Sequence, residues 1–91
     1  MEERLLDMIT DSIQYFDEET IMEIMHFYRH DEYEMALEGL IIELMKIQKY
    51  PPHFSYEEIN KLVLHYHLNV ESVFEYNFWE KYLDWRLYYL S

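Results

Sequence analysis

Two histidines, His26 and His30, have a type and spacing that could support metal chemistry. They lie four positions apart, which places both imidazoles on one face of a helix, and Asp31 could add a third ligand. Both histidines also stand near the C-terminal end of a predicted helix, where the helix dipole favours cations. We prefer this structural interpretation, so we predict neither a metal site nor a cofactor.

Neighbouring acids raise the question of acid and base catalysis, which needs carboxylates of perturbed pKa in a cleft. The pairs Glu18-Glu19 and Glu57-Glu58 instead fall in the first turns of predicted helices, where acids are favoured. The chain has no glycine-rich phosphate loop, no H-E-x-x-H motif and no cysteine. We therefore predict no catalytic residues and expect that the protein is not an enzyme.

Tyrosines and acids around residues 28–38 indicate binding rather than catalysis. Ten tyrosines are too many for so small a domain to bury completely, and tyrosine is favoured as an interface anchor. Two of them bracket a predicted break between helices. The predicted partner-binding residues are Asp31, Glu32, Glu34, Glu38, Tyr28 and Tyr33.

A helix predicted over Asp31–Lys49 carries most of these acids. Advancing about 100° per residue divides it into an apolar half and an acidic half. Asp31 and Glu34 fit a capping-box-like D-x-x-E at its start, which leaves Glu38 without a local structural reason to be acidic. We expect Glu34 and Glu38 to point outward toward a basic partner. Reversing both to lysine should then weaken binding without unfolding the protein.

Four further helical patterns surround this central one. They cover about Glu2–Tyr15, the segment from an N-cap at Asp17 to Tyr28, the segment from a capping box at Ser55 to near His67, and about Glu71–Leu90. Two prolines end the central helix. The single glycine, Gly39, lies inside it, where we expect close approach of a backbone from the same chain or a partner. The sequence predicts an all-α bundle of four to five helices, forming one domain over residues 1–91.

The net charge of −12 makes nucleic acid and anionic membranes poor partners and a basic protein surface a natural one. The amino-terminal residues lack the continuous apolar core of a signal peptide. No stretch approaches the roughly 18 apolar residues of a membrane span. We expect a cytoplasmic protein that binds neither nucleic acid nor membrane.

The segment Glu34–Leu40 reads E-x-A-L-E-x-L and is followed by the apolar stretch Ile41–Met45. At the start of the third helix of a small acidic helical protein, this motif resembles the MafI-type and related immunity proteins. Such proteins accompany bacterial polymorphic toxins, including those of contact-dependent growth inhibition. The resemblance rests on this short segment, and the C-terminal half carries no matching motif.

The resemblance implies a cytoplasmic immunity protein that binds and neutralises a cognate toxin domain, often a nuclease, without catalysis of its own. We expect a monomer when free and a heterodimer with the toxin. The residues leave other functions open: an acidic adaptor or regulator of another basic protein, such as a nucleic-acid mimic, a metal protein using the two histidines, or a homo-oligomer formed through the aromatic C-terminal helix.

Overall fold

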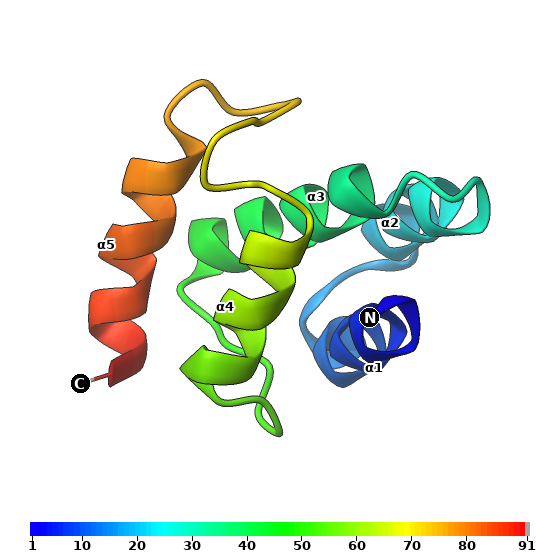
Figure 1. Cartoon of the computed structure of the whole chain (residues 1–91). Coiled ribbons are helices and arrows are strands. Elements are labelled where there is room, and N and C mark those ends of the chain that lie inside the picture. Colours follow the sequence, from blue (N-terminus) through cyan, green and yellow to red (C-terminus); the bar gives the residue numbers. More distant parts are fainter. Residues whose placement is uncertain (91) are drawn as a thin grey trace.

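The central helix of the fold, α3, is surrounded by the other helices of an all-α structure (Figure 1). The computed structural model describes residues 1–90, and within them there is no β-strand. The elements are α1 (Glu2–Ser12), the 3-10 turn η1 (Ile13–Tyr15), α2 (Glu18–Arg29), α3 (Tyr33–Ile47), α4 (Tyr56–His65) and α5 (Phe78–Leu90). The predicted all-α bundle is therefore confirmed. None of the described helices has the length and apolar character needed to cross a membrane.

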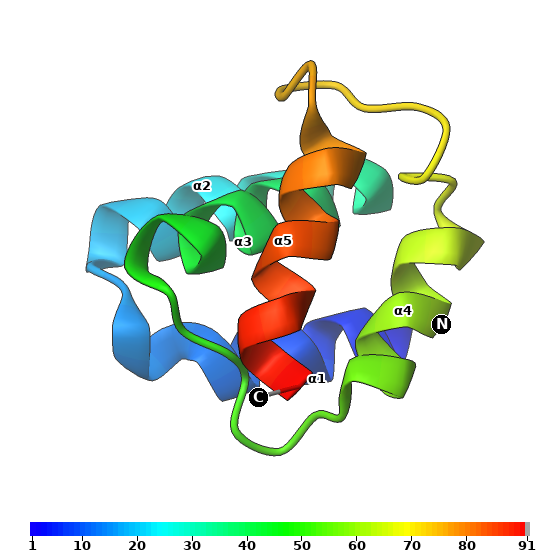
Figure 2. The ribbon, with the colours of Figure 1, turned by 90° about the vertical axis from the view of Figure 1, so that its left-hand side faces the viewer.

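Helix α3 holds its central place through one apolar face. Leu37, Leu40, Ile41 and Leu44 are all fully buried, and their spacing of three and four places them on one side of the helix. Helix α3 contacts α1, α2 and α5, while α4 contacts α5. Figure 2 shows α5 crossing in front of α3, with α1 below α3 and behind the lower end of α5. The apolar half predicted for this helix is thus the face that organises the bundle.

The core draws side chains from every helix and from the connections after α3 and α4. Its buried apolar members are Leu5, Met8, Ile9, Ile24, Ala36, Leu37, Leu40, Ile41, Leu44, Phe54, Ile59, Leu62, Val63, Leu68, Phe78, Tyr82 and Trp85. Removing this apolar surface from water is the main force that drives folding.

Helix α4 begins with the capping box that its sequence predicts. The hydroxyl oxygen of Ser55 accepts the N–H of Glu58 at 3.2 Å, and the Glu58 carboxylate accepts the N–H of Ser55 at the same distance. Arg4 of α1 also donates to the Glu58 carboxylate, which holds the pKa of Glu58 below its usual value. The cap thus joins α1 to the start of α4.

The predicted start of the last helix, near Glu71, is wrong. Helix α5 begins at Phe78, and residues 66–77 form a loop, yellow to orange in Figure 1. The loop leaves α4 through His67, whose φ of 62° is left-handed. The backbone N–H groups of residues 73–75 do not form helical hydrogen bonds, because they donate to a carboxylate of α3.

The predicted capping box at the start of α3 is also wrong. Asp31 has a left-handed φ of 60°, and its carboxylate accepts the hydroxyl of Tyr33 at 2.9 Å. The N-cap position belongs to Glu32, whose side chain makes no capping hydrogen bond. The N–H of Glu32 donates to the carbonyl of Phe27 at 2.9 Å, which closes a tight turn. This turn folds α3 back along α2.

One buried and two half-buried tyrosines are expected to make the fold less stable in alkali. Burial raises the pKa of Tyr82 above its ordinary value, and it also raises those of Tyr50 and Tyr66. A raised folded-state pKa means that the folded protein holds the phenolic proton more tightly than the unfolded chain. The stability that each such tyrosine contributes is complete below about pH 10, the pKa of tyrosine in the unfolded chain, and is lost as the pH rises beyond that value.

The urea midpoint should therefore fall steadily between about pH 9.5 and pH 11.5. Urea titrations followed by far-UV circular dichroism at a series of pH values would measure this change. Tyr82→Phe removes one of the titrating groups, so this variant should show a shallower decline than the unmodified chain. A midpoint that stays constant over the range would contradict the prediction.

Candidate functional site

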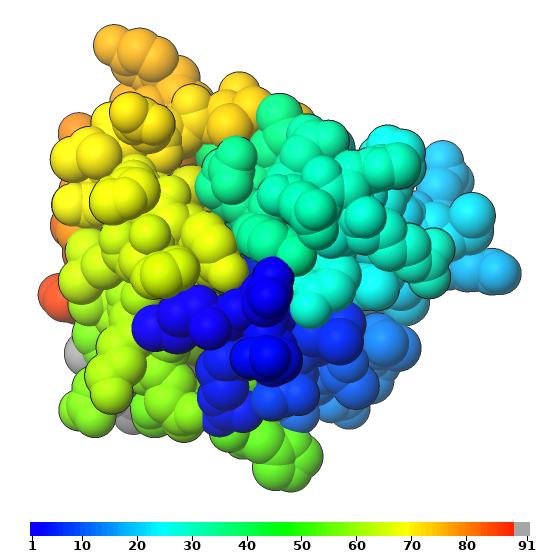
Figure 3. Space-filling view, turned by 45° about the vertical axis from the view of Figure 1, so that its right-hand side comes forward, coloured from blue at the N-terminus to red at the C-terminus, as the bar shows by residue number. Residues whose placement is uncertain are grey.

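The predicted tyrosine pair, Tyr28 and Tyr33, lies where three parts of the chain meet. Their rings pack edge to face with centroids 5.3 Å apart, and the Tyr33 ring lies 6.2 Å from that of Tyr66. The Tyr28 hydroxyl donates to the carbonyl of Glu2 at 3.1 Å. Figure 3 shows the start of α1 beside the α2–α3 turn and the end of α4. Both tyrosines are half-buried, so they have a structural role at this junction.

The acids of the same corner differ in their exposure. Asp31 and Glu34 are exposed, whereas Glu32 is half-buried. Asp31 and Glu34 are the more accessible carboxylates, and contact of a basic partner with Asp31, Glu32, Glu34, Tyr28 and Tyr33 stays a prediction.

Glu38 does not lie on an exposed acidic face, so that part of the prediction is wrong. Its side chain is 0% exposed. One carboxylate oxygen accepts the N–H of Val73 at 2.7 Å, and the other accepts the N–H groups of Phe74 and Glu75, both at 2.9 Å. Three consecutive backbone dipoles take the place of a cation and stabilise the buried negative charge. Glu38 thus anchors the α4–α5 loop to α3.

This anchor changes how the predicted double reversal should be interpreted. A lysine at position 38 would place an ammonium group against three N–H donors, with no acceptor to replace the carboxylate. A variant with lysine at both Glu34 and Glu38 would lose stability as well as charge. Reversal of Glu34 alone, which is exposed, therefore tests whether the acidic surface binds a partner.

The two histidines lie together, but the structure does not complete a metal site around them. The rings of His26 and His30 are 4.4 Å apart and edge to face. The Asp31 carboxylate accepts a hydrogen bond from Tyr33. Across the part of the chain that the structure describes, no group of three or more His, Cys, Asp or Glu side chains is placed to hold a metal ion.

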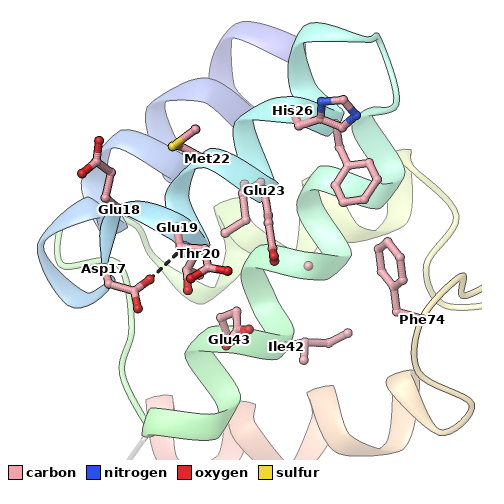
Figure 4. Close-up of a pocket in the computed structure, with 13 residues that line it drawn as sticks. Asp17, Glu18, Glu19, Thr20, Met22, Glu23, His26, Ile42, Glu43 and Phe74 are labelled. Carbon is pink, nitrogen blue, oxygen red and sulfur yellow. Dashed lines mark hydrogen bonds between the residues drawn. The ribbon is translucent and has the colours of Figure 1, made fainter.

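A groove between α2 and α3 is the surface feature that sequence reasoning missed (Figure 4). It encloses about 850 Å³ and we name it the α2–α3 groove. Its lining residues are Asp17, Glu18, Glu19, Thr20, Met22, Glu23, Ile24, His26, Phe27, Gly39, Ile42, Glu43 and Phe74. Apolar side chains and carboxylates both line the groove, so a ligand would need both apolar and positively charged groups.

The carboxylates lie at one end of the groove and along its sides. Asp17, Glu18 and Glu19 stand at the start of α2, and Glu23 and Glu43 lie further along (Figure 4). The N–H of Thr20 donates to Asp17 at 2.9 Å and holds the pKa of Asp17 below its usual value. No lysine or arginine is found among the described lining residues. The rim of the groove is therefore strongly negative.

One positive charge lies close to this rim. The Lys46 ammonium is 3.4 Å from the Glu43 carboxylate. An exposed pair of this kind contributes little energy, typically below about 1 kcal/mol. This pair involves Glu43 of α3, so it does not neutralise the carboxylates of Glu18, Glu19 and Glu23 on α2.

The opposite end of the groove is aromatic. The rings of Phe27 and Phe74 have centroids 5.4 Å apart, and Phe74 remains 49% exposed. Phe74 comes from the loop whose backbone is bound by Glu38. Met22, on α2, is 63% exposed and also lines the groove. Glu38 thus supports the groove indirectly, by fixing the segment that carries its end wall.

Gly39 lines the groove where α3 passes beneath it. A Cβ atom added at this position would meet nothing within 4 Å. The expected close approach of a backbone from the same chain is therefore wrong. The absent side chain instead leaves open space in the groove.

The clue to this groove in the sequence lies on the half of α3 assigned as polar. Gly39 and Ile42 fall there between charged residues, and both line the groove. Helical periodicity places them on that face but does not say whether a neighbouring helix covers them.

Comparison of the chain with known protein families, curated proteins and solved structures finds no match.

Proposed function

We propose that this protein is an immunity protein that binds and neutralises a basic bacterial toxin domain, without catalysis of its own. The observation that carries the proposal is the α2–α3 groove, in which exposed apolar side chains lie beside five carboxylates. Apolar surface bordered by polar groups is the usual anatomy of a protein-binding surface. The sequence motif Glu34–Leu40, similar to that of small immunity proteins, gives the class of partner.

Charge also fits the task of an antidote. The net charge of −12 would attract a basic domain over distance, and such steering raises association rates at low salt. A nuclease is a suitable target, because its active site is built to attract phosphate groups. Binding in the groove or over the exposed acids Asp31 and Glu34 would place negative charge against that surface.

Co-expression with a toxin domain encoded beside this chain tests the proposal. We expect the chain to restore growth and to co-purify with the toxin as a one-to-one complex, measured by light scattering after gel filtration. The variant Glu19→Lys/Glu23→Lys, at the groove rim, should weaken the complex. The matched control, Glu80→Lys/Asp84→Lys, reverses two exposed acids of α5 that lie outside this groove, also four positions apart, and should bind normally.

Two outcomes would count against the proposal. Failure of the unmodified chain to rescue growth, although it is folded and expressed, would remove the toxin as partner. Purification instead with an unrelated basic protein would favour the alternative of an acidic adaptor or regulator.

A further inference from the structure

We infer that the α2–α3 groove binds one amphipathic helix of the partner, with apolar residues over Gly39 and lysines or arginines at the acidic rim. This inference rests on the proposed function for the identity of the partner. The chemistry of the occupant follows from the walls, length and charge of the groove itself.

A helix suits this groove better than an extended segment. Both walls are helices, and the lining residues 18–27 and 39–43 lie within α2 and α3, where backbone groups bond along the helix axis. The groove therefore has no free strand edge. An extended segment buried there would leave its own N–H and C=O groups without partners, whereas a helix satisfies its own.

The length of the groove matches a short helix. Its α2 wall extends from Asp17 to Phe27, which corresponds to about 15 Å at 1.5 Å per residue. A facing helix of about three turns would cover it, presenting apolar side chains at intervals of three and four residues. Met22 suits such an apolar contact, because its flexible side chain adapts to the shape of a partner.

The distribution of charge sets the polarity of the occupant. Acids gather at the Asp17 end, while Phe27 and Phe74 form the other end. The partner helix should thus carry its cations toward the start of α2 and its largest apolar side chain toward the aromatic end. A second copy of this chain is a poor occupant, because each copy carries a net charge of −12.

Gly39 provides a way to fill the groove without disturbing the fold. A Cβ atom there meets nothing within 4 Å, so a side chain added at this position enters open space. The leucine side chain of Gly39→Leu should fill the part of the groove in which the partner helix would lie. Gly39→Ala adds only one methyl group and removes the flexibility of a glycine inside a helix, so this variant should be folded and more heat-stable.

The experiment measures binding of the toxin domain to the unmodified chain, Gly39→Ala and Gly39→Leu by calorimetry, with thermal unfolding as the test of folding. We expect Gly39→Leu to lose roughly 100-fold in affinity, as at the centre of an interface. Gly39→Ala should stay within about tenfold of the unmodified chain. Neither substitution should lower the unfolding temperature.

A synthetic probe separates this inference from the identity of the partner. The probe is a 14-residue peptide with leucines on one helical face and lysines elsewhere, compared with a scrambled peptide of equal composition. We expect the patterned peptide to bind the unmodified chain better than the scrambled one, to shift the amide signals of Gly39 and Ile42, and to bind Gly39→Leu at least tenfold more weakly.

Each outcome has a distinct meaning. Full toxin binding and rescue by Gly39→Leu would overturn the groove inference and leave the proposed function standing. Absence of toxin binding by the unmodified chain, together with Gly39-dependent binding of the patterned peptide, would overturn the toxin proposal and support the groove. Equal binding of the patterned and scrambled peptides by the unmodified chain and by Gly39→Leu would show attraction by charge alone and overturn the inference. A dimer of the free protein that Gly39→Leu dissociates would also overturn it, because a second copy would then be the occupant.

Discussion

Replacing Glu38 with alanine is expected to lower the free energy of unfolding by about 3 kcal/mol. The carboxylate is fully buried and accepts three backbone N–H groups of the α4–α5 loop. Each hydrogen bond to a charged group contributes about 1.5–3 kcal/mol, but burying the charge costs part of that sum. Urea titration of the variant and the unmodified chain would measure the difference.

Glu34→Ala is the matched control, because Glu34 is an exposed acid one turn earlier on the same helix. It should change stability by no more than about 0.5 kcal/mol. Glu38→Gln keeps the shape of the side chain but directs an NH₂ group toward N–H donors, so its loss should fall between the other two. Equal stability of Glu38→Ala and Glu34→Ala would show that the anchor contributes nothing.

Glu38→Ala should also change the α2–α3 groove, although Glu38 does not line it. Without the carboxylate, Phe74 loses the contact that fixes its backbone at the end of the α2–α3 groove. Hydrogen exchange should report this directly, because the amides of Val73, Phe74 and Glu75 would lose protection while those of α3 would keep theirs. A folded Glu38→Ala protein should therefore bind a partner more weakly although it has lost no surface charge.

Local signals in the sequence were sufficient for most of the helices. Asp17 caps α2 through Thr20, and the Ser55 capping box begins α4 as expected. The apolar spacing of α3 correctly identified the face that is buried. Signals of this kind depend on residues within one or two turns of each other, so a single sequence contains them completely.

The errors at Glu38 and at the start of α5 have one common cause. Val73 and Phe74 continue an apolar pattern that resembles a helix, but their N–H groups bind a side chain about 35 residues earlier in the chain. Periodicity cannot detect a contact between such distant segments. An acid on α3 that looked exposed was in fact the reason why the last helix begins late.

The groove escaped prediction for a related reason. Gly39 and Ile42 lie on the side of α3 that periodicity assigns to solvent, and only the positions of α2 and Phe74 turn that side into a groove. Three of the five rim acids were recognised, but they were explained by the start of α2: Asp17 as its N-cap, and Glu18 and Glu19 as the first-turn acids that they indeed are. A capping preference and a binding role can coexist in the same carboxylate.

Replacing Tyr82 with alanine is expected to lower the free energy of unfolding by about 4 kcal/mol, more than the loss expected for Glu38→Ala. The ring is 0% exposed and lies 5.4 Å from that of Trp79 and 6.0 Å from those of Phe78 and Trp85. The hydroxyl donates to the side-chain oxygen of Asn60 at 3.0 Å, which joins α5 to α4. Removing the ring would leave a cavity between these helices.

Tyr82→Phe separates the two contributions, because it removes only the hydroxyl and should cost about 1 kcal/mol. Tyr76→Ala is the control, since Tyr76 is 95% exposed and its loss should change stability by less than about 0.5 kcal/mol. Urea titration with near-UV circular dichroism would measure both stability and aromatic packing. A Tyr82→Ala protein as stable as Tyr76→Ala would place Tyr82 outside the core.

Tyr82→Ala also distinguishes a loss of fold from a loss of recognition. A domain of this size is stable by roughly 5–15 kcal/mol, so a loss of about 4 kcal/mol leaves a folded but weakened population. A partner that binds only the folded state restores stability in proportion to the logarithm of its concentration. Excess toxin domain should therefore raise the unfolding temperature of Tyr82→Ala, whose groove is intact, and should raise that of Gly39→Leu by clearly less, because its affinity is about 100-fold lower. The same rise in both variants would mean that the toxin does not use the groove.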